Sequence, residues 1–471
     1  MNPSSPVEIG TRRELFVDRC LIDRFEGSAT LKLHPPQRRE VVFQVEPPLE
    51  NACSAIYSVL VEDDNQFLLY YRGYYPLHEG SGDTAREQTS HLAVSEDGIH
   101  FERPELGIYD FDDGGRNNVV WQGIQAHNLV PFVDRNPVAA PQRRFKAVGG
   151  TGENNLYALH SPDGVHWSLT RDEPLSVPGK FDSANVAFWH KKLGKYRLFS
   201  RFVETRHGCR FRAIQSCESD DFLHWSDPVP HVYADDAPAE HFYTNATVPC
   251  PGAEHLLLSF PMRFVPHREP PVETGLMKYP GNPGNRGMSD AVMMSSRDGR
   301  HWNRPFPEAW LRAGPDARNW THRNQTPAVG IVANRHDQWS MYAAEHYGWP
   351  DNRLRRLAVR PWGFASINAG RVGGDVITRP LIFSGNELRL NYATSAPGSV
   401  RVEVQDVSGR ALAGLALDDM EPVYGDKLDA TVRWKDNASL QLLNRRPVRL
   451  RFVLCDADVF SFRFANDVAP A

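Results

Sequence analysis

Short apolar runs alternate with polar loops along the first 370 residues, and helical periodicity is almost absent. One set of such runs is Ser54–Val61, Gln66–Arg72 and Thr89–Ser95, and similar sets recur along the chain. Apolar runs of this length, rich in β-branched and aromatic residues and bounded by turn residues, are typical of β-strands. The pattern therefore predicts an all-β fold.

A turn phrase follows the third strand of each set. It has the form Ser-x-Asp-x-x-His-aromatic and stands at Ser95–Phe101, Ser161–Trp167, Ser219–Trp225 and Ser296–Trp302, with a degenerate copy at Arg360–Phe364. Asp-Gly favours a tight turn, and the aromatic residue anchors the strand that follows. Units this small cannot bury their own apolar faces, so five in series predict a five-bladed β-propeller.

The chain changes character near Gly373, where the turn phrase stops. Strand-like runs continue, and Val400–Val404 alternates apolar and polar residues, which predicts a sheet with one buried face. We therefore expect a strand segment at 1–39 that packs on the propeller or closes its ring, a propeller catalytic domain at 40–370 and a β-sandwich at 371–471. A loop rich in Pro and Gly, Tyr279–Arg286, falls inside the fourth blade and is expected to rim a site.

Charge and composition exclude some partners. The formal net charge is −5 and basic residues are scattered, which argues against nucleic acid and acidic lipid surfaces. The six cysteines lack zinc-site spacing, so we expect buried free thiols and no cofactor. The N-terminal residues lack signal-peptide segments, so a cytoplasmic protein without membrane contact is expected, and a homo-oligomer is compatible with the sequence.

The innermost strands of a propeller converge on its axis, so polar residues at the starts of these strands gather in one funnel. This rule and the later strands give the catalytic candidates Asp182, Glu240, Asp290 and Glu345. They also give the substrate-binding candidates Arg72, His127, Asn128, Asn185, Arg201, His241, Tyr243, Asn245, Trp320, Arg323, Asn324, His346 and Tyr347.

Three of the acids stand in distinctive surroundings. Asp182 directly precedes an apolar strand, where burial would raise its pKa or a neighbouring amide would keep it ionised. Glu240 lies among aromatic and imidazole residues, which predicts a dry pocket suited to a general acid. Asp290 opens a strand after the Pro/Gly loop. Paired carboxylates in an aromatic groove are what glycoside hydrolysis requires, although each acid could equally cap a strand.

Two other kinds of function are kept open. The same aromatic and amide residues would suffice for a non-catalytic carbohydrate-binding propeller. Metal-dependent lyase or isomerase chemistry on a sugar derivative would need His241, His322 or His346 to share an ion with carboxylates, and their spacing does not match a preformed zinc site.

Several segments resemble a known group of enzymes: Arg13–Asp18, Phe181–Trp189, Glu240–Asn245, Asn319–Asn324, Glu345–Tyr347 and Leu354–Leu357. Through them nearly the whole chain resembles the five-bladed propeller glycosidases related to glycoside hydrolase families 32 and 43, most closely a bacterial family-32-like group. The resemblance implies a C-terminal β-sandwich and carbohydrate hydrolysis by three acids from inner strands.

One departure from that group is clear. The first-blade position of its usual Asp reads Glu50-Asn51-Ala52 here, and His127-Asn128 stands at the second-blade position. The acids are therefore expected in blades three and four. The sequence predicts a glycoside hydrolase of polysaccharide degradation, with Asp182 and Glu240 as the lead pair and Asp290 or Glu345 as a third carboxylate.

Overall fold

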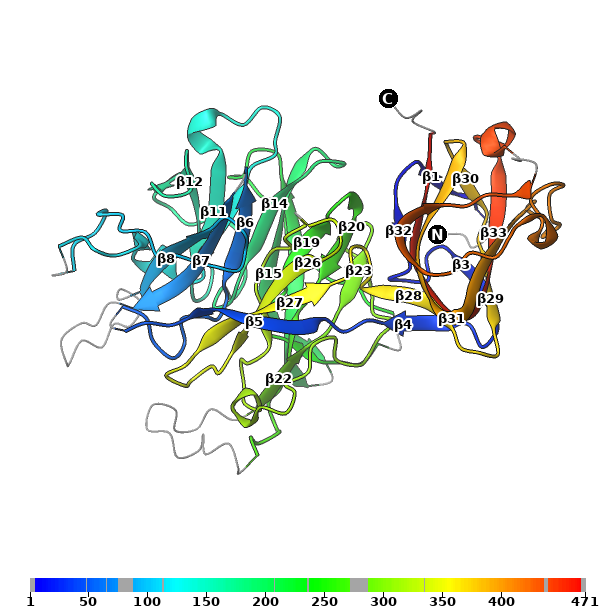
Figure 1. Ribbon diagram of the computed structural model, residues 1–471. Helices are drawn as coiled ribbons and strands as arrows, with labels where there is room; N and C mark the ends of the chain where they lie inside the picture. The colour runs from blue at the N-terminus through cyan, green and yellow to red at the C-terminus, as the bar shows by residue number, and fades with distance from the viewer. Residues whose placement is uncertain are drawn as a thin grey trace. The chain divides into compact units, whose positions relative to one another are not determined.

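The computed structural model describes residues 5–466 except 48, 65, 75–87, 112–113, 207, 235–236, 272–286, 334 and 436–438, so the Tyr279–Arg286 loop lies outside the described residues. The described chain is built of strands with a few short 3-10 turns, which confirms the all-β prediction (Figure 1). Within it, no helix has the length and apolar character to cross a bilayer. Of the six cysteines, only Cys217 and Cys250 are buried, so the expectation of buried thiols holds for two of them.

The chain divides into two compact units. One comprises Pro36–Arg335 and Trp339–Ala358, and the other comprises Met1–Pro35, His336–Gln338 and Val359–Ala471. These bounds differ from the expected ones, because residues up to 35 group with the C-terminal part of the chain.

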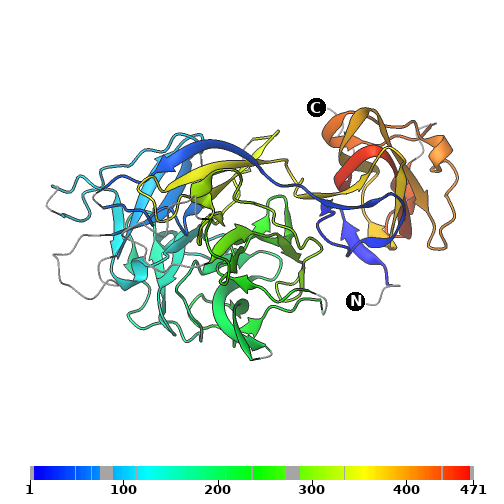
Figure 2. The ribbon, with the colours of Figure 1, turned by 90° about the horizontal axis from the view of Figure 1, so that it is seen from below.

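In its described residues, the unit that begins at Pro36 contains five four-stranded sheets (Figures 1 and 2). In the first three, the order follows the sequence: β6 (Val59–Asp63), β7 (Gln66–Tyr74), β8 (Gln88–Ser95) and β9 (Val119–Gln122); β10 (Val130–Val133), β11 (Phe145–Gly150), β12 (Leu156–Ser161) and β13 (Ser168–Leu169); β14 (Val186–His190), β15 (Lys195–Arg206), β16 (Cys209–Ser219) and β17 (Val229–Pro230).

The last two sheets depart from this simple order. The fourth contains β19 (Thr247–Cys250), β20 (Ala253–Ser259), β23 (Met294–Ser296) and β24 (Trp302–Asn303), and a three-stranded sheet of β18 (His241–Phe242), β21 (Met262–Val265) and β22 (Met288–Ala291) accompanies it. The fifth contains β25 (Thr326–Pro327), β26 (Trp339–Glu345), β27 (Arg353–Val359) and β5 (Gln37–Gln44). Its outer strand therefore comes from the N-terminal end of the unit, and β5 runs antiparallel to β27.

The first four turn phrases share one geometry. In the first, Ser95 Oγ accepts a hydrogen bond from Gly98 N–H at 2.9 Å, Asp97 Oδ1 accepts from His100 N–H at 2.9 Å, and His100 Nδ1 lies 2.7 Å from Asp97 Oδ2. The same contacts recur in the other three. The degenerate fifth phrase differs, because Arg360 instead pairs with Asp426 and contacts Asn391.

Turn phrases also join neighbouring sheets. Tyr70 of the first sheet donates to Gly164 O of the second phrase at 2.8 Å, and Tyr342 of the fifth sheet donates to Gly98 O of the first phrase at 2.7 Å. Arg197 of the third sheet donates to Asp298 O of the fourth phrase. The rings of Phe132 and Phe222 likewise join the second sheet to the third phrase. A backbone hydrogen bond from Leu60 N–H to Val329 O links the first and last sheets again.

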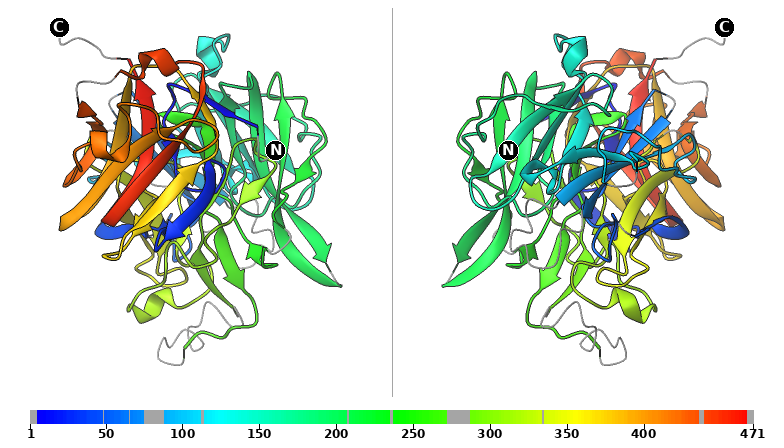
Figure 3. Two further views of the ribbon diagram at one scale, coloured as in Figure 1. Left: turned by 90° about the vertical axis from the view of Figure 1, so that its right-hand side faces the viewer. Right: turned by 90° about the vertical axis from the view of Figure 1, so that its left-hand side faces the viewer.

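The other unit is one ten-stranded arrangement (Figure 3). Its N-terminal strands are β1 (Val7–Gly10), β2 (Glu14–Leu15), β3 (Ile22–Gly27) and β4 (Thr30–Leu33). The remaining strands are β28 (Ala365–Ala369), β29 (Gly374–Thr378), β30 (Leu381–Phe383), β31 (Glu387–Gln405), β32 (Asp426–Thr431) and β33 (Pro447–Ala465). Because β2 pairs with β33 and β3 with β29, the segment expected to close the propeller forms part of this unit instead.

Candidate functional site

Asp182 is held by two basic side chains from different sheets. Its Oδ1 lies 3.0 Å from His127 Nε2, and its Oδ2 lies 3.5 Å from Arg201. Burial would raise the pKa of Asp182, but the His127 hydrogen bond and the charge of Arg201 lower it to about 2. The exposed fraction of the Asp182 side chain is 50%. Asp182 is therefore an ionised carboxylate that solvent can reach.

His127 is buried beside this carboxylate. Burial lowers the pKa of His127 and outweighs the opposite effect of Asp182. Its Nδ1 also contacts the Gln88 side chain. The imidazole is therefore neutral at neutral pH and positions Asp182 through a hydrogen bond rather than through a full ion pair.

Three buried tyrosines lie next to these groups. The rings of Tyr57 and Tyr243 stack with centroids 6.4 Å apart, and the Tyr347 hydroxyl accepts a hydrogen bond from Arg323 at 2.5 Å. Burial raises the pKa of Tyr57 and of Tyr347, so both phenols stay protonated at neutral pH. They can donate hydrogen bonds to a ligand oxygen.

Arginine side chains surround the tyrosine rings. The Cζ atoms of Arg201, Arg212 and Arg323 lie 5.2, 5.0 and 5.5 Å from the ring centroid of Tyr243. Arg72 stands 5.6 Å from the Tyr57 ring. We call these four arginines with Tyr57, Tyr243 and Tyr347 the arginine–tyrosine cluster.

The backbone just before the first strand of four of the sheets adopts left-handed conformations. Tyr57, Asn128, Ala246 and Gln325 have φ values of 60°, 54°, 43° and 56°, and each stands one or two residues before the first strand of its sheet. Arg323 has a φ of 61°. Residues other than glycine rarely adopt this region, and such strain gathers at functional sites.

The predicted asparagines mainly hold this backbone in place. Asn185 donates to Phe181 O and Ser183 O, and Asn245 accepts from Thr247 N–H. Asn324 accepts from Tyr347 N–H at 2.8 Å, which fixes the tyrosine of the cluster. Asn128 differs, because within the described residues neither atom of its buried amide has a hydrogen-bond partner.

Glu240 and Asp290 belong to a separate ion-pair group. Arg263 contacts Glu240 Oε1 at 2.9 Å and Asp290 Oδ2 at 2.6 Å, and Arg304 pairs with Glu240 Oε2. Glu240 therefore lies among cations and not in the dry pocket expected from its neighbours in sequence. Neither acid has a recorded contact with Asp182 in the described part of the chain.

Strand alternation explains this separation. Arg263 and Phe264 are consecutive residues of β21, so their side chains point to opposite faces of the three-stranded sheet. Phe264 packs against Tyr243 with ring centroids 6.0 Å apart. Arg263, with its partners Glu240 and Asp290, therefore lies on the face away from the cluster.

Trp320 and Asp290 line a different hollow. A pocket of about 560 Å³ is bordered by Arg263, Asp290, Ala313 and Trp320 among other residues. Trp320 is partly exposed and donates its indole hydrogen to Gly314 O at 2.7 Å. The pocket contains none of the residues of the arginine–tyrosine cluster.

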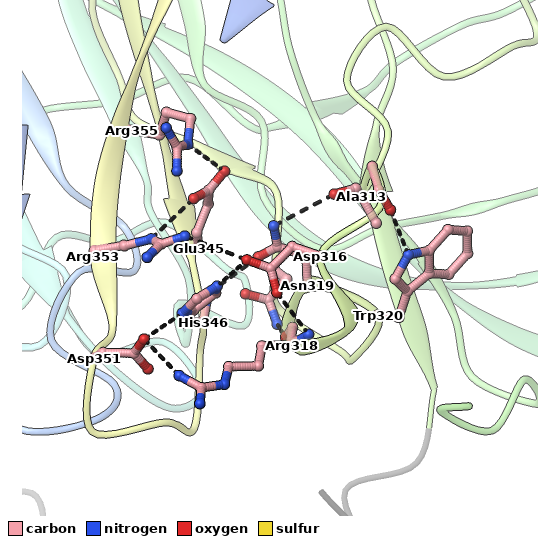
Figure 4. Close-up of polar contacts among 12 residues, drawn as sticks. Ala313, Asp316, Arg318, Asn319, Trp320, Glu345, His346, Asp351, Arg353 and Arg355 are labelled. Atoms are coloured by element: carbon pink, nitrogen blue, oxygen red, sulfur yellow. Dashed lines mark hydrogen bonds and ion pairs between the residues drawn. The ribbon is translucent and has the colours of Figure 1, made fainter. Parts of the chain in front are cut away.

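Glu345 and His346 form a third group (Figure 4). Glu345 is 1% exposed and contacts Arg38, Arg353 and Arg355 at 3.3, 3.1 and 2.8 Å. Its carboxylate is thus surrounded by guanidinium groups and has no path to a ligand through solvent.

His346 lies next to this group and bridges two acids. Its Nε2 and Nδ1 each lie 2.8 Å from a carboxylate, those of Asp316 and Asp351 (Figure 4). Burial would raise the pKa of Asp316, but the hydrogen bond from His346 lowers it overall. Both ring nitrogens of His346 are therefore already occupied.

The remaining predicted histidine, His241, packs between the rings of Phe211 and Phe264, and its Nδ1 accepts from Arg212 N–H at 3.3 Å. Within the described residues, no three His, Cys, Asp or Glu side chains are arranged to hold a metal ion.

The sequence did not single out Tyr57 and Arg212. Tyr57 also lies shortly before the first strand of its sheet. The sequence pattern predicts that this strand starts at Ser54, but in the structure it begins at Val59, so the residues predicted for the site lie too early in the chain. Arg212 lies midway along β16, where no local signal marks it.

Comparisons with known proteins give structural matches only. Neither a scan against protein-family models nor a search of curated proteins found a match. A glycosyl hydrolase from Bacteroides ovatus is 14% identical, with 70% of this chain and 95% of that chain covered and a TM-score of 0.42. A GH32 beta-fructofuranosidase from Bombyx mori is 10% identical, with 91% and 95% covered and a TM-score of 0.43.

A beta-1,2-mannobiose phosphorylase from Listeria innocua is 12% identical, with 69% and 96% covered and a TM-score of 0.41. The matching structures thus include glycoside hydrolases, the group that the sequence motifs resemble. Because each of these TM-scores is below 0.5, the activity of this chain has to be inferred from its own side chains.

Proposed function

We propose that this chain is a glycoside hydrolase of polysaccharide degradation, with its site at the arginine–tyrosine cluster around Asp182. The observation that carries the proposal is the state of Asp182, an ionised and half-exposed carboxylate held by His127 and Arg201. Such a carboxylate can attack an anomeric carbon or activate water. The neighbouring phenols and guanidinium groups supply donors for sugar oxygens.

We further propose that the five sheets are the blades of a five-bladed β-propeller and that the other unit is a β-sandwich. Contacts through the turn phrases join the fifth, first, second, third and fourth sheets in that order, which supports this arrangement. Each sheet also supplies one residue to the site shortly before its first strand: Tyr57, His127, Asp182, Tyr243 and Arg323.

The contacts support Asp182 as the catalytic carboxylate more than the other three acids. Both oxygens of Glu240 are occupied by guanidinium groups, and Asp290 shares Arg263 with it. Glu345 is enclosed by three arginines. We propose that Glu240, Asp290 and Glu345 position the strands around the site, and their catalytic roles stay predictions.

Hydrolysis of a panel of aryl glycosides and of plant and algal polysaccharides tests the proposal. The Asp182→Asn variant should lose about 10²–10⁴-fold in kcat on natural and activated substrates alike. The matched control is Asp220→Asn, which alters an exposed carboxylate, and it should keep wild-type rates. Equal rates for Asp182→Asn and the wild type would reject Asp182 as the catalytic carboxylate.

The general acid is identified by its dependence on the leaving group. A good leaving group needs little protonation, so loss of the acid spares activated aryl glycosides. We expect Glu240→Gln to lower both activities by the same factor, as a positioning residue would. A loss confined to natural linkages would instead make Glu240 the proton donor.

A second candidate function is carbohydrate binding without catalysis. It is favoured by one observation: Glu240, Asp290 and Glu345 are each held by at least one arginine at 3.1 Å or less, so a second carboxylate that is free to act beside Asp182 is not seen among the acids predicted to be catalytic. Binding of a sugar without turnover across the whole panel would support this function over hydrolysis.

A further inference from the structure

Three guanidinium groups converge on one buried ring. Arg201, Arg212 and Arg323 all lie within 5.5 Å of the Tyr243 ring centroid, measured at Cζ. Arg201 and Arg212 come from the β15–β16 hairpin, and Arg323 comes from the segment before β25. Three cations from two parts of the sequence are thus gathered around one aromatic ring.

The hairpin register directs two of these cations to the same side. Arg201 pairs with Ile214, and Arg212 pairs with Val203, two residues further along β15. Residues two apart on a strand share a face, and so do directly paired residues on neighbouring strands. Arg201 and Arg212 are therefore diagonal neighbours on one face of the hairpin.

These cations lack matching negative charge in the described residues. There, Asp182 is the one carboxylate paired with any of the three, at 3.5 Å from Arg201. Other arginines of the unit have close acidic partners, as the buried Arg197 has Glu218 at 3.0 Å and the partly buried Arg103 has Glu50 at 2.8 Å. Among the residues that the structure describes, the cluster therefore has more cationic than anionic side chains.

The physical consequences of this surplus are visible at two side chains. Burial lowers the pKa of Arg212, and the like charges of Arg201 and Arg323 lower it further. Arg323 holds a left-handed backbone conformation, and its buried Nε has no hydrogen-bond partner in the described chain. Cations gathered and desolvated in this way are costly unless an anion compensates them.

We propose that Arg201, Arg212 and Arg323 bind an oxyanion carried by the sugar, either the carboxylate of a uronic acid or a sulfate ester. The inference rests on the proposed function, because it specifies the substrate of the same site. Guanidinium groups bind such oxyanions through paired, charge-assisted hydrogen bonds.

The test is direct binding, measured by calorimetry at constant ionic strength. The probes are D-glucuronate, D-galacturonate and galactose 6-sulfate, each compared with neutral glucose or galactose, and inorganic sulfate serves as the free anion. We expect at least one anionic sugar to bind at least about tenfold more tightly than its neutral counterpart. The uronates and the sulfated sugar separate the two sources of the oxyanion.

Two variants connect the binding to the cluster. Arg212→Gln and Arg323→Gln should each weaken binding of the anionic sugar by about 10- to 100-fold, the range expected for lost charge-assisted hydrogen bonds. The control Arg210→Gln changes an exposed arginine of the same hairpin and should bind as the wild type does. Equal binding by all variants, or no anionic sugar bound at 10 mM, would overturn the proposal.

A second measurement separates ligand binding from a structural role. Without ligand, Arg212→Gln should melt at or above the wild-type temperature, because it removes repulsion between partly buried cations. A fall in melting temperature as large as that caused by Glu345→Gln would show that Arg212 has a structural role. Binding of an anionic sugar without any turnover would support the oxyanion site and reject hydrolysis. Hydrolysis of neutral glycosides alone would support hydrolysis and reject the oxyanion site.

Discussion

His127 Nε2 and Asp182 Oδ1 are 3.0 Å apart, and the two residues occupy similar places in successive sheets, shortly before β10 and β14. The contact therefore fixes a carboxylate of one sheet by an imidazole of the preceding sheet. It gives the site a defined geometry that does not depend on a long loop.

This contact predicts how the loss of stability caused by Asp182→Asn depends on pH. The pKa of Asp182 is about 2 in the folded protein and 3.8 is its ordinary value, so its ionised form stabilises the fold above pH 4. That stability is lost as the pH falls through about 2. The variant should be less stable than the wild type at pH 7 by about 1 kcal/mol or less, because the side chain is half exposed. Urea unfolding at pH 7, 4 and 3 should show the difference shrinking, and a constant difference would contradict the prediction.

Replacing Glu345 should be far more damaging. Glu345→Gln leaves Arg38, Arg353 and Arg355 around a neutral buried amide. Removing one partner of a buried ionic group costs about 3–5 kcal/mol. Chemical denaturation measures the loss, with Asp220→Asn as the exposed control. A loss below about 1 kcal/mol would show that the carboxylate is not the centre of this group.

The turn phrases should respond alike when their aspartate is changed. Asp163→Asn and Asp298→Asn each weaken the acceptor for two backbone N–H groups and for the histidine ring. By analogy with lost helix caps, each should cost about 1 kcal/mol. Thermal unfolding of the two variants compares them directly. Clearly unequal losses would mean that the phrases are not equivalent.

The junction between the fifth and first sheets can be tested at one hydroxyl. Tyr342→Phe removes the 2.7 Å hydrogen bond to Gly98 O without changing the ring. It should cost about 1–2 kcal/mol, because the buried carbonyl loses its side-chain partner. Tyr70→Phe at the next junction should behave similarly, and the exposed Tyr424→Phe should have no effect. Unchanged stability of Tyr342→Phe would show that this hydrogen bond does not stabilise the junction between the two sheets.

The sequence predicted the strands and turn phrases well because both depend on local patterns. Period-two alternation and the Ser, Asp and His of each phrase act within a few residues. The rule about innermost strands found His127, Asp182, Tyr243 and Arg323, and the later strands added Arg72, Arg201 and Tyr347; the structure brings these residues together.

The partners of the other acids could not be predicted in the same way. Glu240 is surrounded in sequence by aromatic residues, but its charge partners Arg263 and Arg304 are 23 and 64 positions away. Strand alternation in β21 then decides which face each residue joins, and this register is not visible from Glu240 itself. The bounds of the two units were missed for a related reason, because strand pairing assigns residues up to 35 to the C-terminal unit.

The placement of β5 has a consequence for synthesis of the chain. Arg356 of β27 pairs with Glu40 of β5 across 316 positions, so the fifth sheet gains its outer strand only after nearly the whole unit has left the ribosome. Until then β5 has no neighbour and the earlier sheets form an open series. Pairings so distant in sequence are slow to form and expose strand edges in the meantime. Until β27 has been made, β5 therefore needs protection from aggregation as the unpaired first strand of this unit.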